Sequence, residues 1–72
     1  LPRLSGKEVI KTLSKIGFEV IRQKGSHVIM KKKTSEGEII TVVPNHTEVD
    51  KGTLIEIIRQ AKLTREDFMG LL

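Results

Sequence analysis

Apolar residues recur at helical spacing near the start of the chain. Val9, Leu13 and Ile16 stand at positions i, i+4 and i+7, which places them on one stripe of a helix. Ahead of them, Ser5-Gly-Lys-Glu8 has the spacing of a capping box, in which each end residue binds the other's backbone N–H through its side chain. The pattern therefore predicts a helix over residues 6–16.

Three stretches rich in β-branched residues follow this helix. Residues 18–23, 27–33 and 38–43 have the composition of strands. Lys24-Gly-Ser26 and Thr34-Ser-Glu-Gly37 separate them and are short enough to be hairpin turns. We therefore expect an antiparallel meander of three strands.

Alternation along each strand predicts which side chains share a face of the sheet. It divides the first strand into two sets, one with Phe18, Val20 and Arg22 and the other with Glu19, Ile21 and Gln23. In the second strand it places Lys31 and Lys33 on the side of His27. The apolar run of residues 39–43 suggests that the third strand is central and more buried, and Pro44 is expected to end it.

Two further helix starts follow a loop expected at residues 45–49. Asp50 is a candidate N-cap for a second helix. Thr64, with Asp67 three residues later, opens a short last helix. The order α-β-β-β-α-α predicts a small α+β domain whose three-stranded antiparallel sheet packs its apolar face against the helices.

The length and composition restrict the classes of protein to be considered. With 72 residues the chain is expected to form a single domain over residues 1–72. It has no cysteine, which excludes disulfides and thiolate zinc sites, and its two aromatic residues cannot form a base-stacking platform. There is no apolar run of membrane-spanning length and no signal peptide, so we expect no membrane association and a cytoplasmic location.

The positive charge of the chain is concentrated in one region. The net charge is +4, which is a mild excess. Between Arg22 and Lys33 there are five basic residues and no acidic one, whereas acidic residues dominate from Glu36 to Asp50. Local clustering matters more than the total charge for binding a polyanion, so this region is the expected contact with a polyanion partner.

His27 is the strongest candidate for a catalytic residue. It follows a small-residue turn inside the basic region, and an imidazole, with an ordinary pKa of about 6.5, transfers protons readily at neutral pH. If the polyanion is RNA, our hypothesis is that His27 deprotonates a ribose 2′-OH, which attacks the adjacent phosphorus and leaves a 2′,3′-cyclic phosphate and a 5′-OH end. Such general acid–base help contributes roughly 10²–10⁴-fold. The alternative is an ordinary surface histidine at a turn.

Four neighbours of His27 are candidates for binding phosphate. Lys24 and Arg22 could neutralise charge on the phosphorane, and Lys24 is the better placed because it adjoins the turn. At Gly25 the absence of a Cβ lets backbone N–H groups approach a phosphate. The Ser26 hydroxyl could bind a phosphate oxygen, although an ordinary hairpin turn would also explain both small residues.

Basic residues farther from His27 in the sequence are weaker candidates for the site. Lys31 and Lys33 could attract RNA from the end of a solvated strand, and Lys7 and Lys11 could follow an RNA backbone along the first helix or simply face solvent. His46 is a possible second acid–base group, with a structural role such as a loop hydrogen bond as the alternative. Two histidines without a nearby carboxylate pair do not suggest a metal site, so we expect activity without metal or cofactor.

Five ordered motifs carry a resemblance to a known family. They are Ser-Gly-Lys-Glu-Val-Ile-Lys, Gly-Phe-Glu-Val-Ile-Arg-Gln-Lys-Gly-Ser-His, Val-Pro-Asn-His, Lys-Gly-Thr-Leu with Ile-Ile-Arg-Gln-Ala, and Leu-Thr-Arg-Glu-Asp-Phe. Together they span residues 5–68 and resemble the HicA toxin family, also called the YcfA family.

The α-β-β-β-α order is that of the double-stranded-RNA-binding-domain fold, and the resemblance implies a bacterial or archaeal toxin that cleaves messenger RNA. It also implies a HicB-type antitoxin that binds the toxin and blocks it, and an essential histidine in the Gly-Ser/Thr-His motif, which here is His27. The alternative is a non-catalytic RNA-binding module of the same fold. Whether the substrate is single- or double-stranded stays open at this point.

Overall fold

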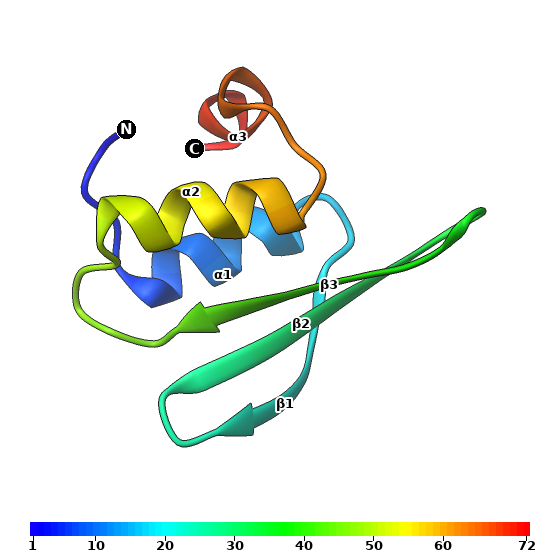
Figure 1. Cartoon of the computed structure of the whole chain (residues 1–72), viewed down its shortest axis with the longest axis horizontal. Coiled ribbons are helices and arrows are strands. Elements are labelled where there is room, and N and C mark those ends of the chain that lie inside the picture. Colours follow the sequence, from blue (N-terminus) through cyan, green and yellow to red (C-terminus); the bar gives the residue numbers. More distant parts are fainter.

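Three helices lie on one side of a three-stranded antiparallel sheet, whose other face is uncovered (Figure 1). The computed structural model describes residues 1–72. The elements are α1 (Gly6–Ser14), β1 (Glu19–Lys24), β2 (His27–Thr34), β3 (Gly37–Pro44), α2 (Lys51–Gln60) and α3 (Arg65–Leu71). This α-β-β-β-α-α order confirms the expected α+β fold of the double-stranded-RNA-binding-domain type. None of the helices has the length and apolarity needed to cross a membrane.

The ends of α1 form largely as the sequence predicts. The Ser5 hydroxyl accepts a hydrogen bond from the Glu8 N–H at 3.1 Å, and the Glu8 carboxylate accepts one from the Ser5 N–H at 2.9 Å. The bond from the Ser5 N–H to the carboxylate favours the ionised form, and with the nearby Ser5 side chain it lowers the pKa of Glu8. After Ser14 the chain makes one more turn, and the N–H of Gly17 donates to the Ser14 carbonyl. The regular helix therefore ends two residues earlier than predicted.

The two later helices begin with the expected caps. The Asp50 carboxylate accepts from the Thr53 N–H at 2.9 Å and from the Thr53 hydroxyl at 2.7 Å, and these bonds lower the pKa of Asp50. Thr64 and Asp67 form a second reciprocal capping box. These starts fix where each helix leaves its loop.

The strand order is β1-β2-β3, so the prediction that the third strand is central was wrong. Turns as short as these connect only neighbouring strands, which places β2 in the middle and β3 at an edge. In β3, Thr41 and Val43 are buried against the helices, whereas Ile40 and Val42 are 50% and 37% exposed. The apolar run thus covers both faces of an edge strand, and Pro44 ends that strand as expected.

A β-bulge in β1 changes which side chains share a face. Val20 is opposite Met30, which is buried beneath the helices, but the register then shifts and Arg22 is opposite Ile29. Residues paired across antiparallel strands share a face. The predicted grouping of Arg22 with Val20 was therefore wrong, because the extra residue at the bulge moves Arg22 to the uncovered face.

The hydrophobic core lies between the helices and the inner face of the sheet. Its thirteen buried apolar residues come from every element except β1, and from the segments between them: Leu4, Val9, Leu13, Phe18, Val28, Met30, Val43, Val49, Leu54, Ile57, Ile58, Ala61 and Phe68. Lys32 is on this inner side, with its ammonium 5.9 Å from the centre of the Phe18 ring. Alternation along β2 turns it away from Lys31 and Lys33.

Main-chain hydrogen bonds join three segments at the end of the molecule where α1 and α2 begin. The Gly6 N–H donates to the His46 carbonyl at 2.8 Å, and the Asn45 N–H donates to the Ser26 carbonyl at 2.6 Å. A Cβ on Gly6 would lie 2.3 Å from the Pro44 carbonyl oxygen. The absence of a side chain at Gly6 therefore allows α1 to dock against the loop that also holds the β1–β2 turn.

We expect Gly6→Ala to destabilise the protein by about 1–3 kcal/mol, as overpacking does. This is opposite to the effect of helix propensity, since alanine normally stabilises a helix relative to glycine. Gly52→Ala in α2 is the matched control, because its Cβ would approach only the Asp50 carboxylate, at 3.5 Å. Urea unfolding midpoints of both variants provide the measurement. Equal midpoints for the two variants would contradict a special role for Gly6.

Candidate functional site

The β1–β2 turn (residues 24–27) has a geometry that requires glycine at its first central position. Gly25 has a φ of +60°, and Ser26 has no positive φ. This is the type II′ pattern, which matches the twist of two-residue hairpins. Nothing lies within 4 Å of the position that a Cβ on Gly25 would occupy. The backbone of the turn is therefore open to a ligand.

Gln23 supports this turn and was missed by the sequence reasoning. Its side-chain amide donates to the Gly25 carbonyl at 3.0 Å. The only signal in the sequence is a glutamine placed two residues before the glycine, which is too common to be diagnostic. The Ser26 hydroxyl, by contrast, is exposed and forms no hydrogen bond within the chain.

His27 is the first residue of β2 and projects from the uncovered face of the sheet. Its neighbour Val28 is buried on the helix side, so alternation turns His27 to the opposite side. The imidazole is exposed and forms no hydrogen bond or ion pair within the chain. Its cross-strand partners are Lys24 in β1 and Pro44 in β3. Both imidazole nitrogens are therefore free to meet a substrate.

Two cations accompany His27 on this face. Lys24 is directly opposite His27, and Arg22 is opposite Ile29, two residues along β2. Neither cation forms an ion pair, since both ion pairs of the chain join other residues. The charges of Arg22 and Lys24 are therefore free to act on a phosphate beside His27.

The other two lysines of this face lie farther along β2. At about 3.3 Å per residue, Lys31 is about 13 Å and Lys33 about 20 Å from His27. Lys31 is paired with Glu38 at 3.1 Å, which offsets part of its charge. The sequence correctly placed both lysines on the side of His27, but the structure separates them from the turn.

An apolar strip lies beside the basic residues of the uncovered face. Ile40 and Val42 of β3 are opposite Lys31 and Ile29 of β2, and both are substantially exposed. Sequence reasoning assigned these side chains to a buried central strand. The signal that could have found them was the pair of short turns, which already required β3 to be an edge strand.

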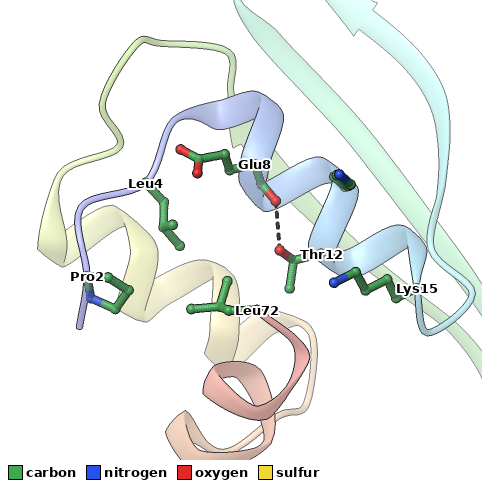
Figure 2. Close-up of a pocket in the computed structure, with 7 residues that line it drawn as sticks. Pro2, Leu4, Glu8, Thr12, Lys15 and Leu72 are labelled. Carbon is green, nitrogen blue, oxygen red and sulfur yellow. Dashed lines mark hydrogen bonds between the residues drawn. The ribbon is translucent and has the colours of Figure 1, made fainter.

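Lys7 and Lys11 lie one helical turn apart on α1 and line two different hollows. Lys7 lines a hollow of about 290 Å³ with Ser5, Asn45, His46 and Thr47. Lys11 lines a different hollow, between the start of the chain, α1 and the C-terminus (Figure 2). In that second hollow the Lys15 ammonium donates to the Leu71 carbonyl at 2.6 Å.

His46 follows Asn45, whose backbone N–H is hydrogen-bonded to the β1–β2 turn. Its carbonyl accepts from Gly6, while its exposed imidazole forms no hydrogen bond within the chain. The bond between Asn45 and Ser26 limits the separation of the His27 and His46 Cα atoms to no more than about 10 Å. No group of three or more His, Cys, Asp or Glu side chains gathers in a way that could hold a metal ion.

Comparison with known proteins gives a family for this arrangement. The family model described as the HicA toxin of bacterial toxin–antitoxin systems matches residues 6–63, from the start of α1 to just beyond α2. A search of curated proteins found no match. The matched span covers most of the 72 residues, including the turn and both histidines. The chain therefore belongs to the HicA toxin family.

Proposed function

We propose that this toxin is a metal-independent endoribonuclease that cleaves messenger RNA with His27 as its general base. The observation that supports this most strongly is a free, exposed imidazole on a glycine turn, with two unpaired cations on the same face. His27 takes the proton of a ribose 2′-OH, and the 2′-oxygen attacks the adjacent phosphorus. The bond from phosphorus to the 5′-oxygen breaks, which leaves a 2′,3′-cyclic phosphate.

Arg22 and Lys24 stabilise the negative charge that develops on the phosphorane. Charge stabilisation of this kind is effective when the donors are already in place before the reaction. The β-bulge supports this role for Arg22, because it brings the guanidinium to the face of His27. The open backbone at Gly25 allows a phosphate to approach the turn.

His46 supplies the second proton transfer. In its protonated form it donates a proton to the departing 5′-oxygen, which leaves as a 5′-OH. The proton gained by His27 and the proton lost by His46 then exchange with solvent, so the reaction balances without a metal. The short main-chain connection between Asn45 and Ser26 supports this pairing of the two imidazoles.

A toxin of this family has an antitoxin partner, and we propose that a HicB-type antitoxin covers the uncovered face of the sheet. Acidic side chains of the antitoxin would face Arg22 and Lys24, since complementary charge accelerates encounter. Its apolar side chains would cover Ile40 and Val42, which are exposed in the free toxin. Binding there would exclude RNA from His27.

We expect His27→Ala to lower RNA cleavage by roughly 10²–10⁴-fold in the presence of excess EDTA. RNA affinity should change little, because one neutral imidazole contributes little to phosphate electrostatics. Cleavage is followed on labelled RNA, product ends are analysed, and binding is measured on 2′-O-methyl RNA. If wild type and variant bind RNA equally and neither cleaves it, the protein is instead a non-catalytic RNA-binding module.

We expect His46→Ala to slow cleavage of ordinary RNA by roughly 10²–10⁴-fold. The same variant should cleave a nucleoside 3′-(4-nitrophenyl phosphate) at nearly the wild-type rate, because nitrophenolate leaves without being protonated. His27→Ala should be slow on both substrates, since the 2′-OH must still lose its proton. Equal slowing of His46→Ala on the two substrates would show that His46 is not the general acid.

We expect Ile40→Gln to weaken antitoxin binding by at least about tenfold, as loss of an apolar contact at the centre of an interface does. RNA cleavage should stay within about twofold, because the substitution removes no charge. Met69→Gln on α3 is the matched control, because Met69 is 44% exposed and lies outside the sheet. Equal affinity of both variants for the cognate antitoxin, measured by calorimetry, would place the interface elsewhere.

A further inference from the structure

A hollow beside the β1–β2 turn is lined entirely by polar side chains. It has a volume of about 290 Å³ and lies between the start of α1 and the loop after β3. Its lining residues are Ser5, Lys7, Asn45, His46 and Thr47. This volume is just below the range for small-molecule sites, about 300–1,000 Å³. The hollow can therefore hold a ligand no larger than about one nucleotide.

The hollow is connected to the turn by a hydrogen bond. The Asn45 N–H, in its wall, donates to the Ser26 carbonyl at 2.6 Å, and Ser26 directly precedes His27. The His46 Cα is within about 10 Å of the His27 Cα. A strand with its scissile phosphate at His27 can therefore place its next nucleotide in the hollow.

The charge of the hollow favours phosphate. Lys7 is exposed and belongs to no ion pair, and none of the lining residues is acidic. The nearby Glu8 carboxylate is held at the Ser5 N–H by the capping box. The Lys7 ammonium is therefore available to an anion that enters the hollow.

We propose that this hollow binds the nucleotide on the leaving-group side of the scissile phosphate, with Lys7 contacting the next phosphate downstream. The assignment rests on the proposed ribonuclease function. The hollow is assigned to the leaving-group side because His46 lines it. In the proposed mechanism His46 donates its proton to the 5′-oxygen of that same nucleotide. Asn45 and Thr47 offer hydrogen-bonding groups to its sugar and base.

The test uses chimeric oligonucleotides with a single ribonucleotide, so that only one bond can be cleaved. One substrate ends with one deoxynucleotide downstream, and the other ends with two and so carries the additional phosphate. We expect Lys7→Gln to raise KM about five- to tenfold for the longer substrate and to leave the shorter one nearly unchanged. Lys62→Gln removes the same charge beyond the far end of α2 and should affect both substrates equally.

The other outcomes separate a failure of this subsite from a failure of the ribonuclease function. An equal effect of Lys7→Gln and Lys62→Gln on the longer substrate would overturn the assignment, as would an equal effect of Lys7→Gln on both substrates. An effect that appears only when a nucleotide is added upstream would also overturn it. If wild type cleaves no substrate, the ribonuclease function itself fails, whereas cleavage that depends on His27 but not on Lys7 removes only this subsite.

Discussion

The close approach of α1 to the loop after β3 is the constraint on which the site depends. The Gly6 N–H bonds the His46 carbonyl, and the space that a Cβ would need is occupied by the backbone of residues 44–46. The same loop holds the Ser26 carbonyl through the Asn45 N–H. One glycine at the start of a helix therefore fixes the relative positions of the turn, the loop and the helix.

This junction explains how a chain of 72 residues can hold a defined site on a small core. The turn that carries His27 is braced by the ladder between β1 and β2, by Gln23 and by Asn45. Because these contacts hold the turn in place, the side chains of His27, Lys24 and Arg22 are not needed to support it and stay exposed and unpaired. The core lies on the other side of the sheet and leaves the uncovered face open to a ligand or a protein partner (Figure 1).

Local interactions made much of the fold predictable. The capping pairs at Ser5 and Thr64 and the cap at Asp50 depend on residues three positions apart, and the structure has all of them. The glycine turn before His27 is also local. Alternation correctly placed Lys31 and Lys33 on the side of His27, because β2 is regular over its whole length.

The features that sequence reasoning missed depend on contacts between distant residues. The bulge that turns Arg22 outward arises from pairing with β2, and no single residue in β1 indicates it. The edge position of β3 was obscured by its apolar run, which serves the core on one face and stays exposed on the other. Lys7 and Lys11 line different hollows because the loop after β3 packs near Lys7, whereas the two termini of the chain pack near Lys11.

The central claim is that RNA is bound at the turn that carries His27. The most direct test is an amide chemical-shift titration of the protein with a 2′-O-methyl RNA, which has no 2′-OH and so stays intact under the proposed mechanism. We expect the largest shifts at Lys24, Gly25, Ser26 and His27, with little change along α3. Shifts concentrated on α3 or around the hollow of Figure 2, with the turn unchanged, would contradict the claim.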